Sequence, residues 1–234
     1  MFPINDDVPS RKKPLVVFAL ILTSAVVFLS EAAMPLPILE AFARRWGLVP
    51  AEVFTNHTLV DLWGLAPLIT HMFVHGGWLH LIGNMWFLWV FGDNVEDSLG
   101  KPRFLVFYLG CGVAGALAQS AFGALAGDTT TPIVGASGAI AGVLGAYLVF
   151  FPYARILTVF FLFFWPFILE LPATVYLGYW FVLQLLQSLW GMGTIEGAGV
   201  AWLAHVAGFG CGWLIARSIK GAKRGRSFRY TRVQ

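Results

Sequence analysis

The sequence predicts an all-α membrane protein in which six transmembrane helices form one bundle, and three observations support this. Hydrophobic residues make up 58% of the 234 residues and charged residues only 12%. The mean hydropathy is +0.75, which excludes an ordinary soluble domain. Six segments are apolar over about 20 residues, the length that crosses a bilayer, and basic residues gather at the two ends of the chain.

The six spans are predicted in chain order and define a single membrane domain, 14–218. They cover about residues 14–33, 77–93, 103–126, 136–152, 172–190 and 199–218. A cytoplasmic N-terminal tail, 1–13, precedes them and a basic cytoplasmic C-terminal tail, 219–234, follows. Basic clusters beside spans more often set topology than bind nucleic acid, so no nucleic-acid partner is expected. The first apolar run imitates a signal peptide, but five more follow, so we expect an uncleaved span.

Two connecting segments are apolar without being predicted spans. Residues 36–46 are amphipathic and contain Arg44 and Arg45, which favours a helix lying in the membrane interface. Segment 156–171 is apolar but short, contains Pro166 and ends near Glu170, so we predict a re-entrant or interfacial stretch. A seventh span is also disfavoured because two cytoplasmic termini require an even number of spans.

With six spans, the second, fourth and sixth helices run in the same direction, from the outside inward. His80, Ser137 and His205 lie near the starts of these helices, within roughly 8 Å of one depth at 1.5 Å per residue. A serine and a histidine are the minimum for nucleophilic hydrolysis, and polar groups are costly inside a bilayer. The pattern therefore predicts a protease active site within the membrane, on its outer side.

Stripes of small residues predict that the fourth and sixth spans pack closely. On the sixth span the stripe is Ala204, Gly208, Gly212 and Ala216; on the fourth it is Ser137, Ala141 and Gly145, with Gly138 and Gly142 beside it. A close crossing would place Ser137 within hydrogen-bond reach of His205. The alternative is that the stripes only pack helices and that Ser137 bonds its own helix backbone.

His80 and Asn84 stand four residues apart on one face of the second span. Acyl transfer needs donors aimed at the oxyanion of the tetrahedral intermediate, and these side chains with the backbone N–H of Ser137 are candidates. The alternatives are that His80 reaches toward water and that Asn84 bonds a neighbouring helix.

His71 and His75 also stand four residues apart, and we expect them to hold the outer connection in place through hydrogen bonds. No metal is expected, because the sequence has neither a His-Glu-x-x-His pattern nor a carboxylate cluster. No acidic residue lies near Ser137 or His205 in the sequence, so a Ser–His dyad without a cofactor is favoured. Cys111 and Cys211 fall in apolar spans and are expected to be packing residues.

From about Leu62 to Arg217 the chain resembles the rhomboid family of intramembrane serine proteases, in its compact six-helix bacterial form. Four ordered motifs carry the resemblance: His71-x-x-x-His75-x-x-x-x-His80-x-x-x-Asn84, Gly92-x-x-x-Glu96-x-x-x-Gly100, Gly135-Ala136-Ser137-Gly138 and Ala204-His205-x-x-Gly208-x-x-x-Gly212. Each motif is weak alone, but their order and their positions in the spans are specific.

The resemblance implies a role for each matching residue. Ser137 is then the nucleophile and His205 the general base and later the acid, while His80, Asn84 and the Ser137 amide stabilise the oxyanion. Gly92, Glu96 and Gly100 are then structural. The implied substrates are transmembrane proteins cut near the outer boundary of the bilayer, without metal or cofactor. The implied location is a bacterial inner membrane.

The chain departs from the family pattern at two places. Many rhomboids carry Trp-Arg in the first loop, where this chain has Ala66-Pro67, and many carry a Tyr four residues after the serine, where this chain has Ala141. His205 therefore needs another neighbour, which the sequence does not identify. A silent relative that binds membrane proteins would be expected to lose Ser137 or His205. A small transporter would be expected to carry charges near the middle of its spans, which are almost absent here.

Overall fold

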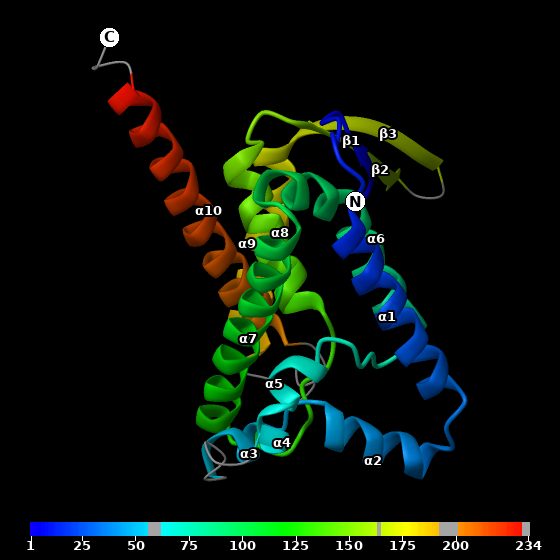
Figure 1. Cartoon of the computed structure of the whole chain (residues 1–234). Helices are drawn as coiled ribbons and strands as arrows, with labels where there is room; N and C mark the ends of the chain where they lie inside the picture. Colours follow the sequence, from blue (N-terminus) through cyan, green and yellow to red (C-terminus); the bar gives the residue numbers. More distant parts are fainter. Residues whose placement is uncertain (56–61, 163–164, 192–200, 231–234) are drawn as a thin grey trace.

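A computed structural model of the chain describes residues 1–55, 62–162, 165–191 and 201–230, and most of these are helical (Figure 1). The helices are α1 (Leu15–Ala32), α2 (Leu36–Trp46), α3 (Pro50–Thr55), α4 (Leu62–Leu65), α5 (Pro67–Thr70), α6 (Trp78–Leu99), α7 (Lys101–Ala126), α8 (Ser137–Phe150), α9 (Ala173–Gly191) and α10 (Trp202–Tyr230). The strands are β1 (Phe2–Asp6), β2 (Arg155–Leu162) and β3 (Trp165–Pro172).

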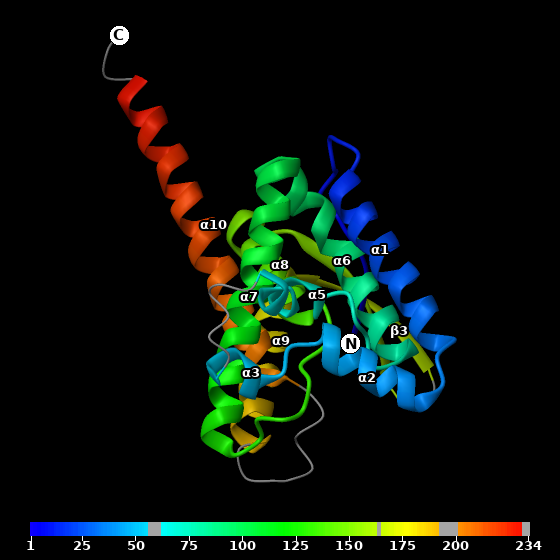
Figure 2. The ribbon, with the colours of Figure 1, turned by 60° about the horizontal axis from the view of Figure 1, so that its bottom comes forward.

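The long helices run side by side between two different ends of the molecule. A three-stranded sheet lies at one end, while α2, α3 and α5 lie at the other (Figures 1 and 2). The N-terminal strand β1 and the last described residues of α10 both lie toward the end that carries the sheet (Figure 1). The predicted amphipathic segment 36–46 forms α2 with the same bounds, because Pro35 precedes its first turn and Gly47 follows its last.

Each predicted span corresponds to a helix, although the lengths differ. Within the described residues, α1 and α7 are each long and apolar enough to cross a bilayer by themselves. α8 is apolar but only 14 residues long. α6 continues to Leu99, beyond the predicted end at residue 93, and α10 continues to Tyr230 through most of the predicted C-terminal tail. Residues 192–200, at the predicted start of the last span, lie outside the described residues.

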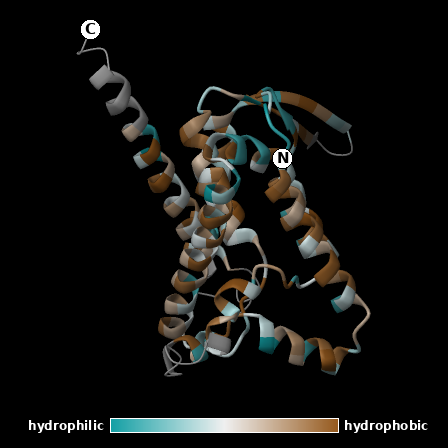
Figure 3. Ribbon diagram, viewed as in Figure 1, coloured by the Kyte–Doolittle hydropathy of each residue, from teal (hydrophilic) through white to brown (hydrophobic). Residues whose placement is uncertain are grey.

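α1 is apolar on its outer face as well as on its packed face. The exposed residues are Leu15, Phe18, Leu22, Val26 and Leu29, and the helix is coloured mostly hydrophobic in Figure 3. The opposite face is buried and contains Val17, Leu20 and Phe28 together with Ser24 and Glu31. An apolar outer face around an interior that contains polar groups is the arrangement expected of a helix that contacts lipid.

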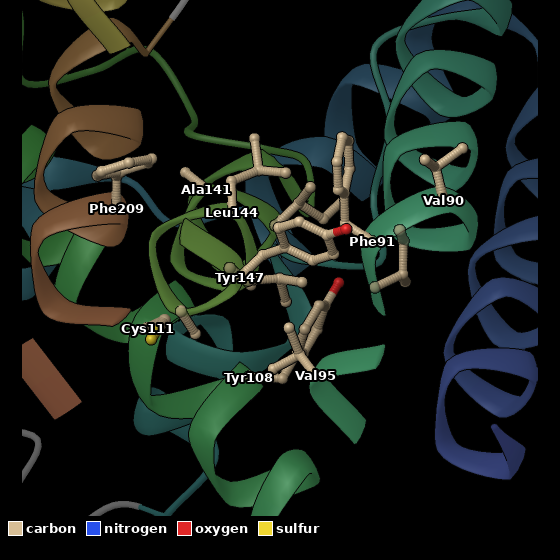
Figure 4. Packing of buried hydrophobic residues seen from close by; sticks show 14 of the residues in the cluster. Val90, Phe91, Val95, Tyr108, Cys111, Ala141, Leu144, Tyr147 and Phe209 are labelled. Carbon is tan, nitrogen blue, oxygen red and sulfur yellow. The ribbon is translucent and has the colours of Figure 1, made fainter. Parts of the chain in front are cut away.

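α8 lies at the centre of the packing and positions everything that follows. Its residues from Gly138 to Tyr147 are all buried, and it packs against α6, α7, α9 and α10. Figure 4 shows the surrounding cluster, in which Tyr147 of α8 meets Phe91 of α6 edge to face, with ring centroids 5.1 Å apart. Cys111 of α7 is buried in the same cluster and is not disulfide-bonded, as its apolar setting predicts.

The segment that we predict to be re-entrant or interfacial, 156–171, forms the antiparallel strands β2 and β3. β1, which lies in the predicted N-terminal tail, pairs antiparallel with β2 and completes the order β1-β2-β3. Pro166 disfavours a helix here, and the many β-branched and aromatic residues favour strands. Pro166 lies on the edge strand β3. Proline is tolerated on an edge strand because the outer side of that strand has no neighbouring strand to bond with. The fold is therefore mostly helical rather than purely α.

Two carboxylates join the N-terminal part of the chain to α6 and α8. Glu96 of α6 accepts hydrogen bonds from the backbone N–H groups of Val16 and Val17, at 3.2 and 2.9 Å. These N–H groups lie in the first turn of α1 and so have no acceptor within their own helix. Asp6 of β1 accepts from the Tyr147 hydroxyl and from Asn94 Nδ2, and burial raises the pKa of Asp6 to about 6.

The glycines of the Gly92/Glu96/Gly100 motif lie at this same junction. A Cβ atom on Gly92 would lie 2.9 Å from Val17 Cγ2, so the missing side chain lets α1 approach α6. Gly100 has φ +82°, a backbone conformation that favours glycine, and it joins α6 directly to α7. All three motif residues thus hold the helices together at the end of the molecule that carries the sheet.

Candidate active site

Ser137 and His205 meet at the contact between α8 and α10. Ser137 is the first residue of α8 and His205 lies in the first turn of α10. The Ser137 hydroxyl and His205 Nε2 are 2.7 Å apart, a normal hydrogen-bond distance. His205 is 9% exposed, whereas Ser137 is only partly buried.

The small-residue stripes explain why this contact is so close. A Cβ atom on Gly208 would lie 2.9 Å from the carbonyl carbon of Gly138, and one on Gly212 would lie 2.6 Å from that of Gly142. Real Cβ atoms essentially never approach so closely, so the backbones of α8 and α10 touch where side chains are absent. This is the close crossing that the four-residue spacing predicts.

The second ring nitrogen of His205 has a partner that the sequence analysis missed. His205 Nδ1 lies 2.6 Å from Oε1 of Gln184 on α9. An amide oxygen only accepts, so Nδ1 carries the proton. Nε2 then presents a lone pair, and the Ser137 hydroxyl donates to it. The available signal was the presence of Gln184 in a mostly apolar predicted span, since polar groups are rare there.

Two tryptophan rings pack around His205. They lie where a tyrosine at position 141 would have been expected to pack, since this chain has Ala141 instead. The Trp202 ring stands edge-on to the imidazole, with ring centroids 5.8 Å apart. The Trp180 ring has its centroid 6.1 Å from that of the imidazole, and the two ring planes are inclined at 34°. Ala141 itself is fully buried. These rings, with Gln184, are the neighbours that the sequence did not identify.

His80 and Asn84 lie against the loop that leads into Ser137. A Cβ atom on Gly135 would lie 2.6 Å from His80 Nε2 and 3.6 Å from Asn84 Nδ2. Gly135 has φ +110°, which favours glycine, so both strain and lack of space exclude a side chain here. Asn84 Nδ2 is buried and has no hydrogen-bond partner in the described part of the chain. His80 Nδ1 accepts the Gly76 N–H at 3.4 Å, which leaves the proton on Nε2, facing Gly135.

His71 and His75 both form hydrogen bonds in the connection before α6. His71 Nδ1 donates to the carbonyl oxygen of Pro67 at 2.8 Å, and the His71 carbonyl accepts the N–H of Gly135 at 2.8 Å. Burial lowers the pKa of His71 to about 4, so the ring is neutral at physiological pH.

His75 is fixed in a similar way by Glu31 of α1. The His75 backbone N–H donates to Glu31 Oε2 at 3.2 Å, and its Nδ1 donates to the Phe73 carbonyl at 3.1 Å. The His75 ring meets the His80 ring edge to face, with centroids 5.3 Å apart. Burial lowers the pKa of His75 to about 4. In the described part of the chain, no group of His, Cys, Asp or Glu residues is suited to hold a metal ion.

Comparisons with known proteins agree on one family. The Rhomboid domain family model matches residues 61–220. The mitochondrial rhomboid protein 1 of Saccharomyces cerevisiae is 32% identical over 142 residues, which is 60% of this chain and 38% of the relative. In Bacillus subtilis, the rhomboid protease GluP is 42% identical over 81 residues and the putative rhomboid protease YdcA 39% over 85 residues. Those matches cover 35% of this chain each, and 15% and 39% of the relatives.

Proposed function

Because the chain belongs to the rhomboid family, we propose that it is an integral membrane serine endopeptidase that cleaves transmembrane proteins. The chain spans about two fifths or less of the length of the relatives described above, so the activity of the whole protein is part of the proposal. The observation that supports it best is the 2.7 Å contact between the Ser137 hydroxyl and His205 Nε2.

Ser137 and His205 act as a dyad in this proposal. Ser137 Oγ attacks the scissile carbonyl while His205 Nε2 takes the hydroxyl proton, giving a tetrahedral intermediate and an imidazolium. The intermediate collapses to an acyl-enzyme as His205 gives the proton to the leaving amine. Water then attacks the ester while His205 accepts its proton, and His205 returns that proton to Ser137 Oγ as the carboxylic acid product leaves. No metal or cofactor takes part.

Three donors are placed to stabilise the oxyanion. Asn84 Nδ2 is buried without a partner in the described residues, and His80 Nε2–H faces the same stretch of backbone at Gly135. The Ser137 N–H belongs to the first residue of α8 and has no acceptor within its own helix. Donors that are held in place before charge develops contribute the largest share of catalysis in such sites, about 3–4 kcal/mol each by mutagenesis.

The topology that we propose has six spans, α1, α6, α7, α8, α9 and α10, within a membrane domain of about residues 14–218. Both termini and the sheet then lie on the cytoplasmic side, while Ser137 and His205 lie toward the outer side. The location we propose is a bacterial inner membrane. The substrates are transmembrane segments whose helix is locally unstable near the outer boundary of the bilayer. In a stable helix the peptide groups are hydrogen-bonded to one another and are not accessible to the nucleophile.

The test is cleavage of a transmembrane reporter in liposomes by the native chain and by Ser137→Ala and His205→Ala. A matched control is Ser218→Ala, an exposed serine on α10 that bonds only its own helix. We expect cleavage by the native chain and by Ser218→Ala and none by the other two. Equal cleavage by Ser137→Ala would refute the proposal.

If the native chain does not cleave the reporter, a serine-directed electrophile distinguishes two explanations. Labelling that Ser137→Ala abolishes would show an active nucleophile and an unsuitable reporter. Absence of labelling in the folded native chain would instead indicate a silent relative that binds membrane proteins.

A further inference from the structure

We propose that Gln184 is a positioning residue that holds His205 in the tautomer required of a general base. The inference rests on the proposed function and adds a third member to the Ser–His pair. It is carried by the geometry of α9, which no sequence motif of the chain indicates.

The contact between Gln184 and His205 is short and enclosed. Gln184 Oε1 lies 2.6 Å from His205 Nδ1, while His205 Nε2 lies 2.7 Å from Ser137 Oγ. Gln184 is 8% and His205 9% exposed, so water does not compete freely for His205 Nδ1. If the proton were on Nε2 instead, the Nδ1 lone pair would face Gln184 Oε1 with no hydrogen between them, and two buried acceptors would lose their partner. This disfavours the tautomer that places the proton on Nε2.

His80 provides an internal contrast. Its Nδ1 accepts the Gly76 N–H at 3.4 Å, so its proton is on Nε2, whereas the Nδ1 of His205 faces an acceptor. The two histidines of the site are therefore held in opposite tautomers. One presents a lone pair to Ser137, and the other presents a proton to the backbone at Gly135.

The neutrality of glutamine suits its place in the membrane. An ionised carboxylate at this position would carry a large desolvation cost, but an amide oxygen accepts the Nδ1 proton without that cost. When His205 takes the Ser137 proton, both ring nitrogens carry hydrogen and Gln184 Oε1 still accepts from Nδ1. The ring thus keeps its orientation through the proton transfer, and the rings of Trp180 and Trp202 confine it.

The experiment compares Gln184→Leu with Gln187→Leu in the full chain. Gln187 lies on the same helix but is exposed, so the two variants share the chemistry of the change, while only Gln184→Leu removes the contact with His205. Gln184→Glu, when ionised, keeps an oxygen acceptor at the same reach and serves as the rescue variant for the tautomer, with its desolvation cost read from thermal unfolding. Each variant is assayed for reporter cleavage and thermal unfolding, and its histidine ring nitrogens are observed by ¹⁵N NMR, with His205 assigned from His205→Ala.

We expect Gln184→Leu to lower kcat by about tenfold to a hundredfold, with KM within about twofold, because the base loses its orientation but substrate contacts remain. Its His205 nitrogens should show mixed tautomers. The native chain, Gln187→Leu and Gln184→Glu should keep the proton on Nδ1.

Two results would overturn the assignment. One is an unchanged His205 tautomer in Gln184→Leu. The other is an equal loss of kcat in Gln184→Leu and Gln187→Leu, which would indicate a general effect on α9. The NMR signature does not depend on turnover, so it decides the role of Gln184 in orienting His205 even if the proposed protease activity fails its own test.

Discussion

Gly212→Ala should separate the two helices that bring Ser137 and His205 together. The Cβ atom of the alanine would lie 2.6 Å from the carbonyl carbon and 2.7 Å from the Cα of Gly142. Carbon atoms in contact are about 3.5 Å apart at the closest favourable separation, so α10 must move about 0.9 Å away from α8. Both obstacles are backbone atoms of a buried helix, so no side chain can rotate to make room.

The magnitude of this shift is large compared with the tolerance of the site. α10 is a continuous helix and transmits the movement to His205, seven residues away. If it lengthens the 2.7 Å contact between Ser137 and His205 by the same amount, the atoms reach about 3.6 Å and no longer form a hydrogen bond. A misplacement of about 1 Å costs on the order of 100-fold in rate, and overpacking costs about 1–3 kcal/mol in stability.

Gly210→Ala is the matched control for Gly212→Ala. Gly210 lies on the same helix, and a Cβ atom there would meet nothing within 4 Å. Alanine in place of glycine raises helix propensity, so this variant should be as stable as the native chain or up to about 1 kcal/mol more stable. Both variants are compared by reporter cleavage in liposomes and by thermal unfolding in detergent. Equal cleavage by Gly212→Ala and Gly210→Ala would refute the reasoning that the backbone contact sets the active-site distance.

Three further predictions concern carboxylates. Glu31→Ala should lower kcat about tenfold, whereas Glu31→Gln should retain activity, because only glutamine keeps an acceptor for the His75 backbone N–H. Equal kinetics of the two variants would contradict this. Burial raises the pKa of Asp6 from its ordinary value of 3.8 to about 6 in the folded chain. Asp6 therefore binds its proton more tightly in the folded than in the unfolded chain. Its contribution to the free energy of unfolding should grow as pH falls from 7 to 4 and be lost as pH rises through 6. The difference in thermal unfolding between the native chain and Asp6→Asn should vary with pH in that sense, and a flat difference would contradict it. Glu96→Leu should destabilise the chain by about 1–3 kcal/mol, since two buried N–H groups of α1 lose their acceptor; unchanged thermal unfolding would contradict this.

Features encoded by local spacing could be predicted from the sequence. The approach of Ser137 to His205 follows from small residues every fourth position on two helices, because that spacing alone fixes which faces meet. The bounds of α2 follow from Pro35 and Gly47 at its ends. α6 runs past its predicted end because Asp93, Asn94 and Glu96 are polar yet helical, so hydropathy marks the end of the apolar stretch rather than of the helix.

Features that depend on long-range placement could not be predicted. Gln184 reaches His205 only because α9 is rotated to present that side chain, and the sequence does not specify the rotation. The pairing of β1 with β2 joins residues such as Phe2 and Val159, and an apolar segment alone does not reveal a partner so distant. The partner of His205 and the sheet were therefore both missed, although the contact between Ser137 and His205 was predicted.

The sheet also has a consequence for the order in which the chain assembles during synthesis. β1 leaves the ribosome before its partner β2, which follows only after α1, α6, α7 and α8 have been made. Joining segments so far apart carries a loop-closure cost that falls once the intervening helices are folded. The helices must then associate first, and β1 closes over them afterwards, when Asp6 can reach Tyr147 and Asn94. β1 is thus synthesised before the helices that it contacts, yet it is among the last segments to reach its native contacts.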